Sequence, residues 1–244
     1  MGKCCIDGKS KEAVTIDIEK KLRKLYQKLS SHLSPAQELH SASPLSLGKG
    51  DPLKVLIIAV LSQATTDLNC RRAYEALVKR FPTWDELVQA DSREIARAIA
   101  PGGLANNKAP RLQQILKVIR DQEGEFSLNR LGEVSRDEAY AYLTSLPGVG
   151  TKTAACVWAF GFDKPALPVD THVGRVLIRL GLFDTSDPVK IQKALEEAAP
   201  SEIQKDLHIL LIEFGRRFCT KRKPKCAECP LAAECNYRTR GETQ

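Results

Sequence analysis

Apolar residues recur at helical spacing along almost the whole chain of 244 residues, and this periodicity constrains the fold more than any other feature. No run of residues alternates between apolar and polar side chains in the way a half-buried strand does. We therefore predict an all-α fold with about eleven helices, the first of them near residues 14–33.

Two segments break the helical pattern. Residues 34–49 are rich in serine, proline and glycine, which predicts a linker or a long loop. From about residue 219 onward, cysteines and basic residues replace the helical spacing. Because 43% of the residues are hydrophobic, the chain can bury a core in one large domain or in two modest ones.

The composition favours a soluble intracellular protein with a polyanionic partner. The longest apolar run, residues 55–61, is far too short to span a bilayer, and the first residues lack the apolar core of a signal peptide. Lysine and arginine number 37 against 30 aspartates and glutamates, which gives a formal charge of +7. Such an excess attracts nucleic acids, although many basic proteins bind none.

The eight cysteines point to a metal site, because disulfides are rare inside cells and nothing in the sequence is secretory. Four of them form a C-x6-C-x2-C-x5-C pattern: Cys219, Cys226, Cys229 and Cys235. Structural zinc usually takes two C-x2-C pairs, whereas a cubane cluster accepts uneven spacing because each thiolate binds a different iron. The pattern favours an iron–sulfur cluster over zinc, and disulfides least. Cys70 and Cys156 are expected to be small buried hydrophobes.

Basic residues crowd the start of this cysteine pattern. Lys221, Arg222 and Lys223 follow the first cysteine, shortly after Arg216 and Arg217. A loop made rigid by a metal cluster would present these charges to DNA phosphates in a fixed array. An ordinary solvated basic stretch is the alternative interpretation.

The stretch LPGVGTKTA, residues 146–154, predicts a helix, a tight hairpin and a second helix. Gly148 and Gly150 permit positive φ and leave backbone N–H groups unobstructed at the helix start, where a DNA phosphate can dock. A phosphate loop for nucleotides is disfavoured, because Thr151 separates Gly150 from Lys152. A plain connection between helices is the remaining alternative.

Lys152 and Asp170 are the candidate reactive residues. Lys152 falls in the first turn of the second helix, where the positive helix dipole and partial desolvation would lower its pKa and favour the nucleophilic amine. A surface lysine or a simple phosphate contact is the alternative. Asp170 precedes a helical run and can be an N-cap, a carboxylate that stabilises positive charge, or both. His172 is equally open.

Together these features closely resemble the endonuclease III family of DNA glycosylases, within the helix–hairpin–helix superfamily. The resemblance rests on LPGVGTKTA, on PVDTH, whose aspartate lies 18 residues beyond Lys152, and on the terminal cysteine pattern. It extends from about residue 50 to about residue 238 and includes LIIAVLSQATTD and GGLANNKA.

The resemblance implies a role for each matching residue. Lys152 would attack C1′ of the damaged nucleoside, expel the base and form a Schiff base, and β-elimination would cut the strand 3′ to the lesion. Asp170 would assist base loss and stabilise the cationic sugar. Gln63 would fill the gap left by the extruded base, Leu104 would wedge into the stack, and the four terminal cysteines would bind a [4Fe-4S] cluster.

The family also implies a domain organisation and a partner. A six-helix domain with the hairpin would cover residues 50–163. Residues 1–33 would pack with a cluster domain, residues 164–244, and the DNA cleft would lie between the two domains. The expected partner of this monomer is duplex DNA with an oxidised pyrimidine or an abasic site, in a bacterial cytoplasm or nucleoid, a nucleus or an organelle. Pro110 departs from the pattern, because it should interrupt its helix.

Two alternative functions remain open from the sequence. A monofunctional adenine or mismatch glycosylase keeps the aspartate but generally lacks a lysine at position 152, and the adenine type usually adds a further C-terminal domain. A noncatalytic iron–sulfur module that binds DNA or senses redox state would leave the lysine and aspartate unexplained.

Overall fold

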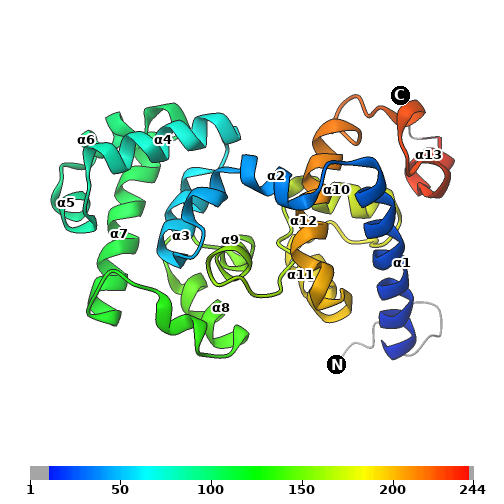
Figure 1. Cartoon of the computed structure of the whole chain (residues 1–244), viewed down its shortest axis with the longest axis horizontal. Coiled ribbons are helices and arrows are strands. Elements are labelled where there is room, and N and C mark those ends of the chain that lie inside the picture. The colour runs from blue at the N-terminus through cyan, green and yellow to red at the C-terminus, as the bar shows by residue number, and fades with distance from the viewer. Residues whose placement is uncertain (1–10, 242–244) are drawn as a thin grey trace. The chain divides into compact units, whose positions relative to one another are not determined.

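The computed structural model describes residues 11–241, and every regular element in that range is helical, which confirms the predicted all-α class (Figure 1). Cys4 and Cys5 lie outside the described residues. His40–Lys164 form one compact unit, here named the hairpin unit. The described residues before and after them form a second, the cysteine unit. None of the described helices is both long and apolar enough to cross a membrane.

The hairpin unit is built around one helix that is apolar except for a single lysine. Its helices are α3 (Pro52–Leu61), α4 (Asp67–Arg80), α5 (Trp84–Gln89), α6 (Ser92–Ala98), α7 (Ala105–Glu123), α8 (Arg136–Ser145) and α9 (Thr151–Cys156). In α3 every residue except Lys54 is buried, and α4, α7 and α9 all contact it. A helix that is apolar on all sides must lie inside the core, and here it starts at the Asp51 N-cap and at Pro52 in the first turn.

The cysteine unit joins the N-terminal helix to the C-terminal ones. Its helices are α1 (Lys11–His32), α10 (Thr171–Arg179), α11 (Pro188–Ala198), α12 (Ser201–Arg217) and α13 (Asn236–Thr239). Leu22, Leu25 and Leu29 recur at helical spacing on α1 and enter a core shared with α10, α11 and α12. Burial of this apolar stripe attaches the first helix to residues more than a hundred positions away.

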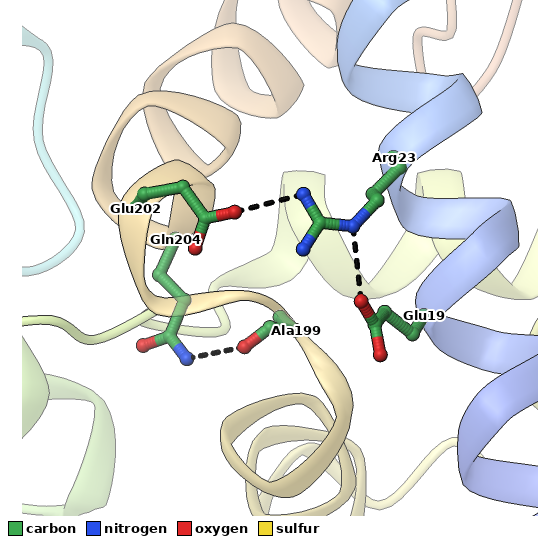
Figure 2. A network of polar contacts seen from close by, with 5 residues as sticks. All are labelled: Glu19, Arg23, Ala199, Glu202 and Gln204. Carbon is green, nitrogen blue, oxygen red and sulfur yellow. Dashed lines mark hydrogen bonds and ion pairs between the residues drawn. The ribbon is translucent and has the colours of Figure 1, made fainter.

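Polar contacts at the edge of this core also fasten α1 to α12. Figure 2 shows Arg23 donating to Glu19 on its own helix at 2.9 Å and to Glu202 at the start of α12 at 2.8 Å. Beside them Gln204 donates to the carbonyl of Ala199, at the end of α11, at 2.8 Å. Because the ion pairs are exposed, their contribution to stability is small, and the apolar core carries the attachment.

Residues 34–49 are helical rather than a loop, and this differs from the sequence prediction. They contain α2 (Ala36–Ala42) and a 3-10 turn over Pro44–Gly48. Serine and proline start the 3-10 turn instead of breaking it: Ser43 accepts from the backbone N–H of Leu45, and Pro44 occupies the first position of the turn. With α2 and the short α13, the described chain has thirteen α-helices where about eleven were expected.

Pro110 does not interrupt its helix. It lies inside α7, which runs unbroken from Ala105 to Glu123. Buried residues flank the proline on both sides, among them Lys108, Ala109 and Leu112. Tertiary packing along this face therefore outweighs the single backbone hydrogen bond that proline removes.

Candidate functional site

The hairpin predicted at residues 146–150 connects α8 to α9 as expected. Gly148 is exposed and has φ +71°, a left-handed conformation that favours glycine. Gly150 is the N-cap of α9 with extended backbone, φ −99° and ψ 178°, so only one of the two glycines uses positive φ. A Cβ placed on Gly150 would meet no atom within 4 Å, which leaves this end of α9 sterically open.

Alanine substitutions should separate the roles of the two glycines. Gly148→Ala is expected to lower the free energy of unfolding by about 1–2 kcal/mol, because its φ is left-handed and its Cβ would crowd Arg111. Gly150→Ala should change it by less than about 0.5 kcal/mol. If a phosphate docks at Gly150, the methyl group that this alanine introduces should still weaken DNA binding about tenfold. Urea unfolding and fluorescence anisotropy measure both effects, and equal losses of stability would contradict the assignment.

Lys152 lies in the first turn of α9, where the sequence places it. Its side chain is half-buried, and the four residues after it, Thr153 to Cys156, are fully enclosed in the core. Burial raises the pKa of the Cys70 thiol to about 11, and the positive charges of Lys108 and Lys152 oppose that rise. Lys152 therefore stands at the edge of a dry interior and not on an open helix surface.

Gln63 lies against the hairpin, although the two are 85 positions apart in sequence. Its Nε2 donates to the carbonyl of Gly148 at 3.4 Å, and its Oε1 accepts from Arg111 at 3.1 Å. The Arg111 side chain also lies close to Gly148, since a Cβ there would lie 2.5 Å from its Nε. The structure thus brings two predicted residues, Gln63 and Gly148, together with a cation that the sequence analysis did not single out.

Leu104 projects from the loop before α7. Its side chain is 57% exposed, and its backbone has φ 49°, which is rare for a leucine. An exposed apolar side chain on a strained backbone carries a cost that folding does not recover, and such strain is concentrated at sites of function. The wedge role remains a prediction that this conformation supports.

Asp170 is the N-cap of α10 in the cysteine unit. Its Oδ1 accepts from the backbone N–H groups of His172 and Val173, both at 2.8 Å. The extended segment before it is fixed by two buried side chains that sequence reasoning missed. Gln192 accepts from the N–H of Val169 at 3.3 Å, and Nδ1 of His208 lies 2.7 Å from the carbonyl oxygen of Pro168.

His172 is held beside Asp170 and is disposed to be neutral. Its Nδ1 lies 3.1 Å from a nitrogen of Arg175, which also donates to the carbonyls of Gly215 and Cys219. Burial lowers the pKa of His172; the Asp170 charge opposes this shift and the Arg175 charge adds to it. A lowered pKa favours the neutral imidazole, which can take part in a hydrogen bond but carries no charge.

The basic loop after Cys219 has a fixed backbone and exposed side chains. Arg179 donates to the carbonyl oxygens of Thr220 at 2.8 Å and Lys221 at 3.1 Å. The side chains of Lys221, Arg222 and Lys223 are exposed. A backbone held by these hydrogen bonds presents the cations to solvent, and their contact with phosphates stays a prediction.

The four C-terminal cysteines line a single pocket, together with apolar residues such as Leu180, Phe214 and Leu231. Among the described residues, no three cysteine, histidine or acidic side chains are grouped closely enough to hold one metal ion. Thiols that surround a space fit a multi-atom cluster better than a single zinc. None of the six described cysteines is in a disulfide, and Cys70 and Cys156 are buried as expected.

The structure divides the predicted site residues between the two units. The hairpin unit contains Gln63, Leu104, Gly148, Gly150 and Lys152. The cysteine unit contains Asp170, His172, the basic loop and the four cysteines. Each group is assembled from segments that are distant in sequence, as the contacts of Gln63 and Arg175 show.

Comparison with known proteins places these features in one family. Residues 57–201 match the model of the HhH-GPD superfamily of base excision DNA repair proteins. The chain is 36% identical to endonuclease III of Thermotoga maritima over 208 residues, 85% of this chain and 93% of that protein. It is also 36% identical to endonuclease III of Bacillus subtilis over 186 residues, 76% of this chain and 81% of that protein.

A solved structure has the same arrangement of helices. A trapped covalent intermediate of an endonuclease III with DNA superposes with a TM-score of 0.75 at 29% identity, over 92% of this chain and 98% of that one. The sequence match and this superposition agree over nearly the whole chain. The chain therefore belongs to the endonuclease III family of base excision repair DNA glycosylases, within the HhH-GPD superfamily.

Proposed function

We propose that this protein is a bifunctional DNA glycosylase and abasic-site lyase that removes oxidised pyrimidines from duplex DNA. The observation that carries the proposal is Lys152, half-buried in the first turn of α9 directly after the Gly148–Gly150 hairpin. A solved relative is described as a trapped covalent intermediate with DNA, and a lyase step through a Schiff base requires an amine near the sugar.

The proposed reaction begins when the Lys152 amine attacks C1′ of the damaged nucleoside. The glycosidic bond breaks with its electron pair on the base, which leaves after taking up a proton. Asp170 stabilises the positive charge that develops on the sugar. Ring opening gives a Schiff base between Nζ and C1′, and loss of a proton from C2′ expels the 3′ phosphate by β-elimination.

The damaged nucleotide must leave the stack before this attack, because C1′ is out of reach inside an intact duplex. Gln63 and Leu104 are proposed to occupy the space and to hold the helix open, which offsets part of an unstacking cost of a few kcal/mol, roughly. Gly148, Gly150, Lys221, Arg222 and Lys223 are proposed to hold phosphates, and His172 to contact the strand near Asp170.

A lesion panel tests this function. Duplexes with an oxidised pyrimidine or an abasic site are incubated with the protein, and base release and strand cleavage are measured separately. We expect both, and we expect borohydride to trap a covalent protein–DNA complex by reducing the Schiff base. Base release without cleavage or trapping would instead indicate the monofunctional alternative.

We propose that Cys219, Cys226, Cys229 and Cys235 hold a [4Fe-4S] cluster. The pocket that they line, the apolar residues around it and the short contact of 3.3 Å from Arg179 to the Cys219 sulfur support this assignment. When bound, the cluster would act as a structural clip that fixes the basic loop, because four protein thiolates leave its irons no open position.

Cluster loss should be visible without any activity assay. Cys226→Ser is expected to reduce iron below the roughly four atoms per chain that wild type holds and to remove its brown colour. The melting temperature should fall by about 5 °C or more. Cys70→Ala, which removes a buried thiol outside the pocket, should keep its iron. A wild-type protein that contains zinc and is colourless would contradict the assignment.

A further inference from the structure

Lys108 is an unusual buried residue whose role the proposed reaction does not explain. Only 1% of it is exposed, and burial lowers the pKa of its amine. Its Nζ donates to two backbone carbonyl oxygens, Leu61 at 2.6 Å and Gly102 at 2.9 Å. Burial of an ammonium carries a desolvation cost, which these two hydrogen bonds offset only in part.

The two carbonyls mark the places where two loops begin. Leu61 is the last residue of α3, and the next loop carries Gln63. Gly102 ends a 3-10 turn, and the loop after it carries Leu104. Helix ends expose unpaired carbonyls with partial negative charge, so one cation can satisfy both ends at once.

The loops also lie close to one another. A Cβ placed on Gly102 would lie 3.9 Å from the carbonyl oxygen of Leu61, and one on Gly103 would lie 4.0 Å from that of Ala64. Three non-glycine residues of the described chain have positive φ, and two of them, Ala64 and Leu104, lie in these loops. Strain of this kind persists only where the surroundings fix the backbone firmly.

We propose that Lys108 is a positioning residue for base extrusion, whose ammonium joins the Gln63 loop and the Leu104 loop into one rigid element that enters the DNA together. The inference rests on the proposed function, because it takes Gln63 and Leu104 as the residues that contact the opened helix. Lys108 itself touches neither DNA nor substrate. It acts by holding two backbone carbonyls in place. Gln63 would then fill the gap left by the extruded base at the same time as Leu104 wedges into the stack.

The test measures insertion of the loops without any chemistry. The probe is a duplex with a tetrahydrofuran abasic-site analogue and 2-aminopurine opposite it, whose fluorescence rises when it is unstacked. At saturating protein, Lys108→Met should give less than about a third of the wild-type rise. In a Gln63→Ala, Leu104→Ala background the same substitution should have no further effect, because the residues it positions are gone.

Gln113 offers a matched control on the same helix. Its amide donates to the carbonyls of Leu87, Val88 and Ala90 at 3.2, 3.1 and 2.8 Å, at the end of α5 and away from both loops. Gln113→Met removes a comparable set of bonds and should give the full wild-type rise. If Lys108→Met does not fold, Lys108→Gln, which retains an N–H donor, should give a rise between those of wild type and the Gln63→Ala, Leu104→Ala variant.

Single-turnover excision of a paired oxidised pyrimidine provides the second readout. Lys108→Met should slow it by about tenfold or more, and by less than about threefold in the Gln63→Ala, Leu104→Ala background. Equal slowing in both backgrounds, or a wild-type fluorescence rise with Lys108→Met, would overturn the inference. If wild-type protein unstacks the probe but excises no base, the proposed function is wrong while the role of Lys108 stands.

Discussion

Lys152→Ala is expected to give no covalent complex with DNA after borohydride treatment and to lose strand cleavage by about 10³-fold or more. The reason is that alanine has no amine to attack C1′. The Schiff base therefore cannot form, and the β-elimination that follows from it cannot proceed. The measurement is gel separation of trapped complex and cleaved strand under single-turnover conditions, with wild type in parallel. Trapping by Lys152→Ala as efficient as by wild type would exclude the lyase assignment.

Two further variants separate chemistry from charge in this experiment. Lys152→Arg retains the positive charge, but a guanidinium stays protonated and is not a nucleophile, so DNA binding should persist while trapping is lost. Lys79→Ala removes an exposed lysine in the last turn of α4 and should behave as wild type. Loss of trapping with Lys79→Ala would indicate a general effect of charge on DNA affinity.

The all-α fold could be predicted from apolar periodicity because burial of one helix face is a local property of the sequence. The helices with strong stripes, such as α1 and α11, were found for this reason. Helix α2 was missed because it is short and lies between serine and proline residues that resemble a loop in the sequence. The hairpin at Gly148 followed from local rules, although only tertiary structure could show that Gly150 remains extended.

The supporting residues of the site could not be predicted in the same way. Lys108 reads as an ordinary surface lysine, and its burial depends on two carbonyls at the ends of other segments. Arg111 also meets Gln63 and Gly148 only through the packing of α7. The clamp of Gln192 and His208 around the segment before Asp170 joins three separate parts of the chain. Such contacts have no periodicity or spacing in the sequence to reveal them.

Asp170→Asn is expected to slow base excision by about 10²-fold or more while the fold remains intact. An asparagine oxygen can still accept from the N–H groups of His172 and Val173, and asparagine is as good an N-cap as aspartate, so α10 should start unchanged. What the variant lacks is the negative charge that we propose stabilises the developing sugar cation. Single-turnover base release and thermal unfolding measure the two properties separately.

A second substrate, DNA with a preformed abasic site, distinguishes a role of Asp170 in base loss from a purely structural role. On DNA with a preformed abasic site the base has already gone, so Asp170→Asn should cleave the strand within about tenfold of wild type. Asp170→Ala should in addition lose about 1 kcal/mol of stability, because the helix cap is removed. If Asp170→Asn lost excision and abasic-site cleavage to the same extent, with an unchanged melting temperature, the carboxylate would serve the lyase step as well, and the specific role in base loss would be wrong.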